Sequence, residues 1–199
     1  MKEMLKNAGI LLAITVIAGF ILGAVYQITK EPIAKTEEAA RLAAYKEVFA
    51  DASDFTEIAY DPAVLTEGGI IDTEIDNVME AKGEDGTLLG YVFVITNHEG
   101  YGGDIQFSLG VSLDGTTNGI SILSISETPG LGMEAENVLK PQFSGKKALQ
   151  FSYTKTGAVT EDQIDAISGA TITTNAVTNG VNAGLYYFRN ALGGGMADE

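Results

Sequence analysis

The sequence predicts an α+β protein in which a single N-terminal transmembrane helix precedes a domain with a central, largely antiparallel sheet flanked by helices. Three observations predict this fold class. Residues 7–29 carry no charged side chain. Residues 70–125 hold apolar runs separated by glycine-rich turns, which is typical of hairpins. Residues 171–192 repeat apolar side chains at spacings of three and four, which indicates a helix that faces a core.

The composition narrows the possible classes of function. The 199 residues include 12 basic and 27 acidic side chains, and this net charge of −15 argues against a nucleic-acid partner. The chain has no cysteine, which excludes disulfides and thiolate ligands for an iron–sulfur cluster. Its single histidine, His98, leaves no His-based metal site or triad. We expect no catalytic side chain and no metal, so redox chemistry would have to come from an organic cofactor.

The uncharged stretch 7–29 is long enough to cross a bilayer at a rise of about 1.5 Å per residue. A buried core helix and a signal peptide cleaved near Gly23-Ala24 are the alternatives, but a signal peptide has a shorter apolar run of roughly 7–15 residues. We expect residues 1–30 to form an uncleaved single-pass anchor in contact with membrane lipid. A short basic start before a long acidic domain favours a cytoplasmic N-terminus and an extracytoplasmic domain.

A juxtamembrane helix and loop are expected at 31–69. Pro32 suits a first helical position, and the helix that follows is expected to continue from the membrane as a short stalk. Residues 35–49 have the pattern of an amphipathic helix. The side chains expected on its apolar face are Leu42, Tyr45, Val48 and Phe49. Residues 51–69 contain Pro62 and little periodicity, which indicates a loop.

Two hairpins are expected to form the sheet, with turns at 83–86 and 114–119. The four strands expected are 77–82, 88–96, 104–113 and 119–126. Residues 92–95 are all apolar, which implies a strand covered on both faces. Between the hairpins, 99–103 combines three glycines with Tyr101. Such a loop admits a flat ligand, or it is simply a flexible connection.

The segment after the sheet begins with a tight turn. Pro129-Gly130 forces the turn, and Gly132 permits an unusual dihedral angle. Glu127 and Thr128 then lie at a strand end, where ligand-contacting residues are often placed. Taken alone, this is an ordinary turn. The elements expected after it are a short helix at 134–139 ended by Pro141, a strand at 148–154 and, beyond the last helix, a disordered tail at 193–199.

The stretch Asp165-Ala-Ile-Ser-Gly-Ala-Thr171 leads into the last helix. Asp165 and Ser168 can cap that helix, because their oxygens accept N–H groups of its first turn. Gly169 and Ala170 allow a bulky anion to approach the backbone. Thr171 adds a hydroxyl where the helix dipole favours a phosphate. A plain helix cap is the alternative.

This stretch resembles the flavinylation motif of the FMN-binding domain family, which has the form Asp-x-x-Ser-Gly-Ala-Thr. In that family a separate flavin transferase links FMN through its phosphate to the last threonine. The resemblance implies an FMN-binding domain at 70–192 with a covalent FMN in phosphoester linkage to Thr171. The other motif positions are Asp165, Ser168, Gly169 and Ala170.

The turn Glu127-Thr-Pro-Gly-Leu-Gly132 resembles a signature of the G subunit of the Rnf complex and of the C subunit of the sodium-pumping NADH:quinone oxidoreductase. Gly100-Tyr-Gly-Gly103 and Phe143-x-Gly-Lys146 resemble two further segments of these subunits, whereas Ser126 stands where some members carry a basic residue. The short chain favours the G subunit of Rnf. The flavin-binding residues that this resemblance implies are Tyr101, Glu127, Thr128, Pro129, Gly130, Leu131 and Gly132.

The resemblance further implies an electron-transfer subunit of a membrane-bound, ion-translocating ferredoxin:NAD⁺ oxidoreductase. Such a subunit belongs to a translocase and is not catalytic in isolation. Its partners would be the multispan, flavin-containing and iron–sulfur subunits of the complex, together with the flavin transferase during maturation. The alternatives are a stand-alone extracytoplasmic flavin shuttle and an anchored binding module without redox chemistry.

Overall fold

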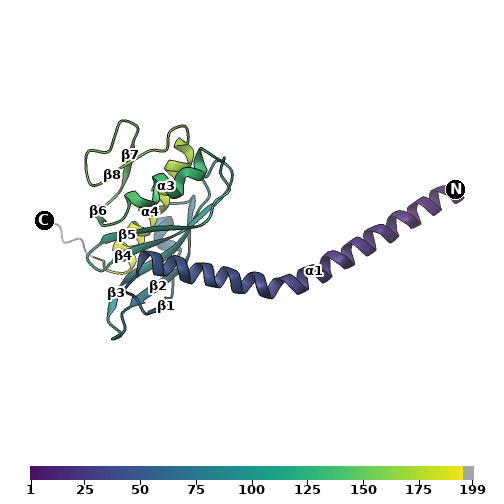
Figure 1. The fold of residues 1–199 in the computed structure, drawn as a ribbon, viewed down its shortest axis with the longest axis horizontal. Coiled ribbons are helices and arrows are strands. Elements are labelled where there is room, and N and C mark those ends of the chain that lie inside the picture. The colour runs from purple at the N-terminus through teal and green to yellow at the C-terminus, as the bar shows by residue number, and fades with distance from the viewer. Residues whose placement is uncertain (195–199) are drawn as a thin grey trace. The chain divides into compact units, whose positions relative to one another are not determined.

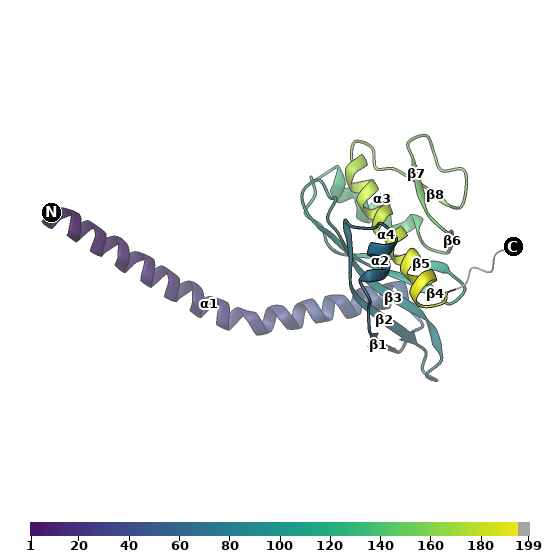
Figure 2. The same ribbon diagram turned by 180° about the vertical axis from the view of Figure 1, so that it is seen from behind.

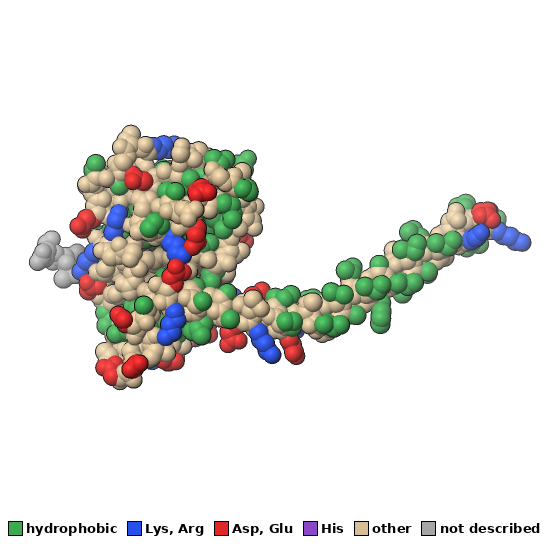
Figure 3. All heavy atoms as spheres, in the orientation of Figure 1, with side chains coloured by type: hydrophobic (Ala, Val, Ile, Leu, Met, Phe, Trp, Pro, Cys, Tyr) green, Lys and Arg blue, Asp and Glu red, His purple; other side chains and the backbone are tan. Residues whose placement is uncertain are grey.

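The computed structural model describes residues 1–194 and separates into two compact units, Met1–Ala40 and the part from Arg41 onward. The first unit consists of most of helix α1 (Lys2–Val48). Its apolar side chains are exposed along the helix, as Figure 3 shows. This helix is long and apolar enough to cross a membrane. An α-helix satisfies its own backbone hydrogen bonds, as a segment within lipid must.

Pro32 lies inside α1 and not at a first helical position, whereas the expected continuation of the helix beyond the membrane stretch is confirmed. Proline removes one backbone donor, but its neighbours from Ala34 to Ala44 are mostly strong helix formers, so the helix continues. One turn further along, the hydroxyl of Thr36 donates to the Pro32 carbonyl oxygen at 2.9 Å. The anchor and the juxtamembrane helix are therefore one element.

The second unit is built on a six-stranded sheet in the order β1-β2-β3-β4-β5-β6 (Figure 1). Every neighbouring pair is antiparallel, so the chain meanders from one strand to the next. The strands are β1 (Asp54–Ile58), β2 (Thr73–Lys82), β3 (Leu88–Asn97), β4 (Ile105–Ser112), β5 (Thr116–Ser124) and β6 (Lys146–Lys147). Strands β7 (Ser152–Thr154) and β8 (Gln163–Asp165) form a separate parallel pair. The predicted antiparallel sheet is confirmed.

Helices cover both faces of this sheet (Figures 1 and 2). Helix α4 (Thr171–Ala191) packs on one face and the last turns of α1 pack on the other. Strand β3 shows the division, because Phe93 and Ile95 join the core under α4 while Val92 and Val94 join the smaller core under α1. The prediction that this strand is covered on both faces is confirmed. The α1 side chains in the smaller core are Tyr45 and Val48, with Phe49 just beyond the helix end.

Two features of the juxtamembrane segment differ from the prediction. Leu42 was expected on the apolar face of the helix but is 51% exposed, whereas Ala44, which was not expected there, is buried. Residues 51–69 are not a loop, because they contain β1 and the short helix α2 (Ala63–Glu67). Both elements have only five residues, too few to show periodicity, and β1 obtains its hydrogen-bond partners from β2.

The later boundaries also shift. The second hairpin turn is shorter than expected, and Gly119 lies within β5 beside an irregularity in its pairing with β4. The strand expected at 148–154 shrinks to β7. The short helix expected at 134–139 is present as η1 (Gly132–Glu134), α3 (Ala135–Val138) and η2 (Lys140–Gln142). Most of the tail expected at 193–199 lies outside the described residues. The domain boundaries at 30, 69 and 192 stay predictions.

Candidate functional site

Three segments far apart in the sequence enclose a cavity of about 520 Å³. They are the glycine-rich loop between β3 and β4, the turn after β5, and the N-terminal end of α4. The lining residues are Tyr101, Glu127, Thr128, Leu131, Gly132, Gly169, Ala170, Thr171, Ile172 and Thr173. All of them except Ile172 and Thr173 are candidate site residues from the sequence. Ile172 and Thr173 lie in the first turn of α4, next to Thr171. The helical pattern that starts at Thr171 could therefore have identified both as site residues from the sequence.

The buried carboxylate of Glu127 connects two of these segments. Its Oε1 accepts hydrogen bonds from the backbone N–H groups of Tyr101 at 2.7 Å and of Gly102 at 3.3 Å. Such charge-assisted bonds to backbone donors are among the stronger hydrogen bonds in proteins. Glu127 therefore fixes the loop that carries the 71% exposed ring of Tyr101 at the cavity.

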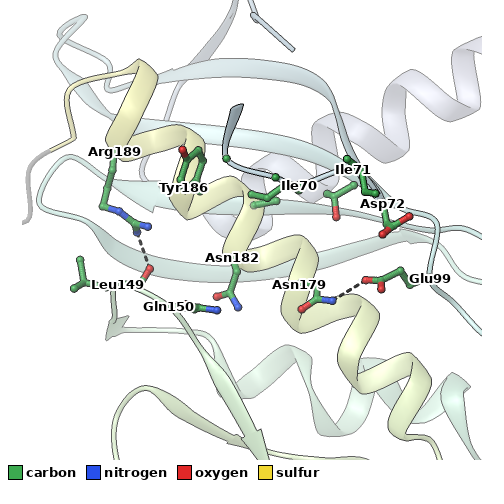
Figure 4. Close-up of a pocket in the computed structure, with 14 residues that line it drawn as sticks. Ile70, Ile71, Asp72, Glu99, Leu149, Gln150, Asn179, Asn182, Tyr186 and Arg189 are labelled. Carbon is green, nitrogen blue, oxygen red and sulfur yellow. Dashed lines mark hydrogen bonds between the residues drawn. The ribbon is translucent and has the colours of Figure 1, made fainter. Parts of the chain in front are cut away.

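The glycine-rich loop between β3 and β4 is also hydrogen-bonded to α4. Oε2 of Glu99 accepts a hydrogen bond from Nδ2 of Asn179 at 2.7 Å, as Figure 4 shows. Glu99 lies at the edge of a second, more polar cavity of about 340 Å³ beside α4. In Figure 4, Asn182 and Arg189 follow Asn179 along the helix, and Arg189 donates to the Leu149 carbonyl oxygen at 2.7 Å. No candidate site residue from the sequence lines this second cavity.

The turn after β5 needs glycine at two positions for different reasons. Gly130 has a φ of 74°, which confirms the tight turn at Pro129-Gly130. Gly132 does not have a positive φ, so the prediction of an unusual dihedral angle there is wrong. A Cβ at Gly132 would instead lie 2.5 Å from Oγ1 of Thr173 and 2.6 Å from Cβ of Glu127. Close approach of the turn to α4 is what excludes a side chain.

Neither Asp165 nor Ser168 caps α4, contrary to the sequence prediction. The N-cap residue is Ala170, and no side chain of residues 1–194 caps this helix end with a hydrogen bond. Asp165 ends β8, and Gly169, with a φ of 77°, turns the chain between that strand and the helix. Oδ1 of Asp165 accepts instead from the backbone N–H of Ala158 at 2.6 Å. The N–H groups of the first turn, which begins at Thr171, are therefore free of side-chain acceptors.

Thr171 also lines a smaller hollow of about 290 Å³. The remaining lining residues of this hollow are Lys155, Ala166, Ile167, Ser168 and Gly169. Ser168 is thus next to the acceptor candidate without entering the larger cavity. Asp165, Pro129 and Gly130 line neither hollow.

Comparison with known proteins places the chain in a family. Residues 1–48 match the RnfG N-terminal region, and residues 100–186 match the FMN-binding domain. The G subunit of the Na⁺-translocating ferredoxin:NAD⁺ oxidoreductase complex of Acetobacterium woodii is 32% identical over 193 residues, which cover 95% of this chain and 93% of that protein. The chain belongs to this G-subunit family.

Other G subunits are similar to the same extent. The G subunit of the ion-translocating oxidoreductase complex of Methanosarcina acetivorans is 32% identical over 193 residues, or 94% of this chain and 95% of that protein. Among solved structures, NqrC of Shewanella oneidensis has 20% sequence identity and a TM-score of 0.49, and the match covers 71% of this chain and 70% of that one. The segments that line the 520 Å³ cavity, from Tyr101 to Thr173, all fall within the matched FMN-binding domain.

Proposed function

We propose that this G-subunit family member carries electrons in an ion-translocating ferredoxin:NAD⁺ oxidoreductase, on an FMN joined through its phosphate to the hydroxyl of Thr171. One observation carries the proposal: Thr171 lines a cavity that is built from the three segments with G-subunit signatures. The family membership supports the electron-transfer role, and the motif that ends at Thr171 supports the linkage.

The residues at this cavity suit an FMN. Its volume of about 520 Å³ falls in the usual range for small-molecule sites. Tyr101, Leu131 and Ile172 supply aromatic and apolar surface for a flat ring system. Gly132 lets the turn approach Thr173 and Glu127 closely, which brings these cavity-lining residues together. The uncapped N–H groups at the start of α4 suit a phosphate next to Thr171.

When bound, the flavin would supply the electron-accepting and electron-donating chemistry, and the chain's own residues would position it. The Thr171 oxygen would form the ester and keep the cofactor at a high effective concentration in a site open to solvent. Glu127 would hold the Tyr101 loop against the cavity through its two backbone hydrogen bonds. The roles of Thr128, Pro129 and Gly130 would be to shape the turn on the opposite wall.

The same proposal covers assembly and topology. Helix α1 would anchor the subunit in the lipid bilayer, with its N-terminus in the cytoplasm and the domain outside. A flavin transferase would attach the cofactor there, and the mature subunit would join the multispan, flavin-containing and iron–sulfur subunits. Copurification of those subunits with the full chain tests the assembly. A flavinylated chain that always purifies alone would instead indicate a stand-alone shuttle.

The linkage is tested by intact mass and in-gel fluorescence of the full chain coexpressed with its flavin transferase. Thr171→Ala should lose the flavin mass completely, because no hydroxyl remains to form the ester. Thr171→Ser should retain part of it. Thr160→Val is the control, since it removes an exposed hydroxyl that lines neither hollow and should label fully. Labelling of the Thr171→Ala chain at the wild-type level would show that the acceptor lies elsewhere.

A further inference from the structure

The smaller hollow beside Thr171 contains a lysine that the flavin motif does not include. Lys155 lines this hollow of about 290 Å³ together with Ser168, Gly169 and Thr171. The acceptor candidate and a lysine therefore line the same hollow. The larger cavity, in contrast, contains only the carboxylate of Glu127 as a charged group.

Within the described residues 1–194, Lys155 forms no ion pair and no side-chain hydrogen bond, and of the lysines without such a partner it is the one that lines the hollow beside Thr171. The ammonium groups of Lys82 and Lys140 form ion pairs with glutamates, and Lys46 and Lys146 donate to backbone carbonyl oxygens. Lys155 has no such partner in that part of the chain, although the chain has a net charge of −15 and offers many carboxylates. A lysine that forms no ion pair in the described residues, and that lines the same hollow as a hydroxyl that would bear a phosphate, is available to that phosphate.

The backbone holds Lys155 close to the motif at two points. The N–H of Ala166 donates to the carbonyl oxygen of Thr154 at 2.8 Å, directly before Lys155. The N–H of Ala158 donates to Oδ1 of Asp165 at 2.6 Å, three residues after it. The hydrogen bond to Asp165 therefore holds the turn 154–158, which contains Lys155, next to the motif.

We propose that Lys155 is a positioning and charge-neutralising residue for the phosphate on Thr171, and that Asp165 acts through it by anchoring the turn 154–158. This inference rests on the proposed function. In the attachment step, Oγ1 of Thr171 bonds to phosphorus and its proton leaves to a base or to solvent. A phosphoanhydride bond of a flavin dinucleotide breaks, and a nucleoside monophosphate leaves with the electron pair of that bond. No redox change occurs, and the charge that develops on the phosphoryl oxygens lies beside the Lys155 ammonium.

The test measures initial rates of flavin attachment to the full chain in detergent, with flavin transferase and flavin dinucleotide. Lys155→Gln should lower kcat on the order of tenfold, because one cation beside the phosphoryl oxygens is lost. Lys155→Arg should stay close to the wild type. Lys147→Gln is the matched control: this exposed lysine lines neither hollow, so the same net charge is removed without a change in rate. Added salt should slow the wild type more than Lys155→Gln, because salt screens an exposed cation.

A second measurement separates the phosphate from the transferase as the partner of Lys155. In the fully labelled chain, the ³¹P chemical shift of the ester should differ between the wild type and Lys155→Gln, and Lys147→Gln should match the wild type. A rise in KM for the acceptor chain with an unchanged ³¹P shift would assign Lys155 to transferase binding and overturn the proposal. Equal kcat in Lys155→Gln and the wild type would also overturn it.

The role of Asp165 is tested by a double-mutant cycle. Asp165→Ala should slow attachment, and the double variant with Lys155→Gln should be no slower than the slower single variant, because both changes remove one interaction. Fully additive effects would contradict action through Lys155. These results differ from failure of the proposed function, in which Thr171→Ala itself would still be labelled.

Discussion

Single residues set the shape of the cavity, and Gly132 offers the sharpest test at this scale. Gly132→Ala should reduce the free energy of unfolding by about 1–3 kcal/mol, because the new methyl group overlaps Thr173 and Glu127. It should also shift the absorption band of the attached flavin, since both neighbours line the cavity. Gly86→Ala is the control: its φ of 79° makes it costly for alanine, but it has open space around it and lies in the turn between β2 and β3, where it lines neither hollow. A wild-type flavin spectrum in Gly132→Ala would contradict a role of this turn in the site.

His98 and Asp104 bracket the loop that carries Tyr101, and their contact predicts a pH dependence. Nδ1 of His98 lies 3.0 Å from Oδ1 of Asp104. This hydrogen bond, with the nearby charges of Asp104, Glu74 and Asp76, raises the pKa of His98 above its ordinary value. The resulting stabilisation is fully present below the unfolded-state pKa of about 6.5 and is lost as the pH rises through the folded-state pKa.

Because His98 is the single histidine of the chain, its NMR titration is unambiguous. We expect a folded-state pKa above about 6.5 and a lower one in Asp104→Asn. The same substitution should flatten the fall of unfolding free energy between neutral and mildly alkaline pH. A wild-type His98 that titrates at or below its ordinary value would contradict this account.

Among the elements, the end of α1 contributes a structural layer of the domain. Phe49 is 6% exposed and packs with Val92 and Val94 against the sheet face opposite α4. Phe49→Ala should therefore reduce the free energy of unfolding by about 3–5 kcal/mol, measured by urea denaturation with circular dichroism. Leu42→Ala, on the exposed side of the same helix, should cost less than about 0.5 kcal/mol. Equal losses would place Leu42 in the core, as the sequence alone suggested.

The elements also show what the sequence can and cannot predict. Helix α4 and strand β3 follow from patterns of apolar residues within one segment, and both were predicted. Strand β1 was missed, because five residues show no period and the strand depends on hydrogen bonds from β2. The place of Asp165 was missed for a related reason. A capping pattern is local, whereas its hydrogen bond to Ala158 depends on the parallel pairing of β7 with β8. Lys155 was not identified from the sequence either, because its position beside the motif depends on the same pairing of β7 with β8.

At the scale of the whole molecule, the chain is suited to a topology test because it has no cysteine. Val159→Cys places one thiol on the domain at a side chain that is 85% exposed, and Met4→Cys places one near the N-terminus. A membrane-impermeant maleimide added to intact cells should label Val159→Cys and spare Met4→Cys. Permeabilised cells should label both. The opposite pattern in intact cells would place the domain in the cytoplasm.

The order of the sheet has a consequence for how the protein matures. Strands β1 to β5 pair with neighbours in sequence, so they can assemble while the chain is still being synthesised. Helix α4 comes last, yet it supplies a large share of the main core and carries Thr171 at its first position. Until α4 docks, the glycine-rich loop, the turn and the helix start are not assembled into one surface. Flavin attachment would then require complete folding. A chain that ends before α4, or in which α4 does not dock, would stay colourless and could be distinguished by absorbance from a fully folded chain.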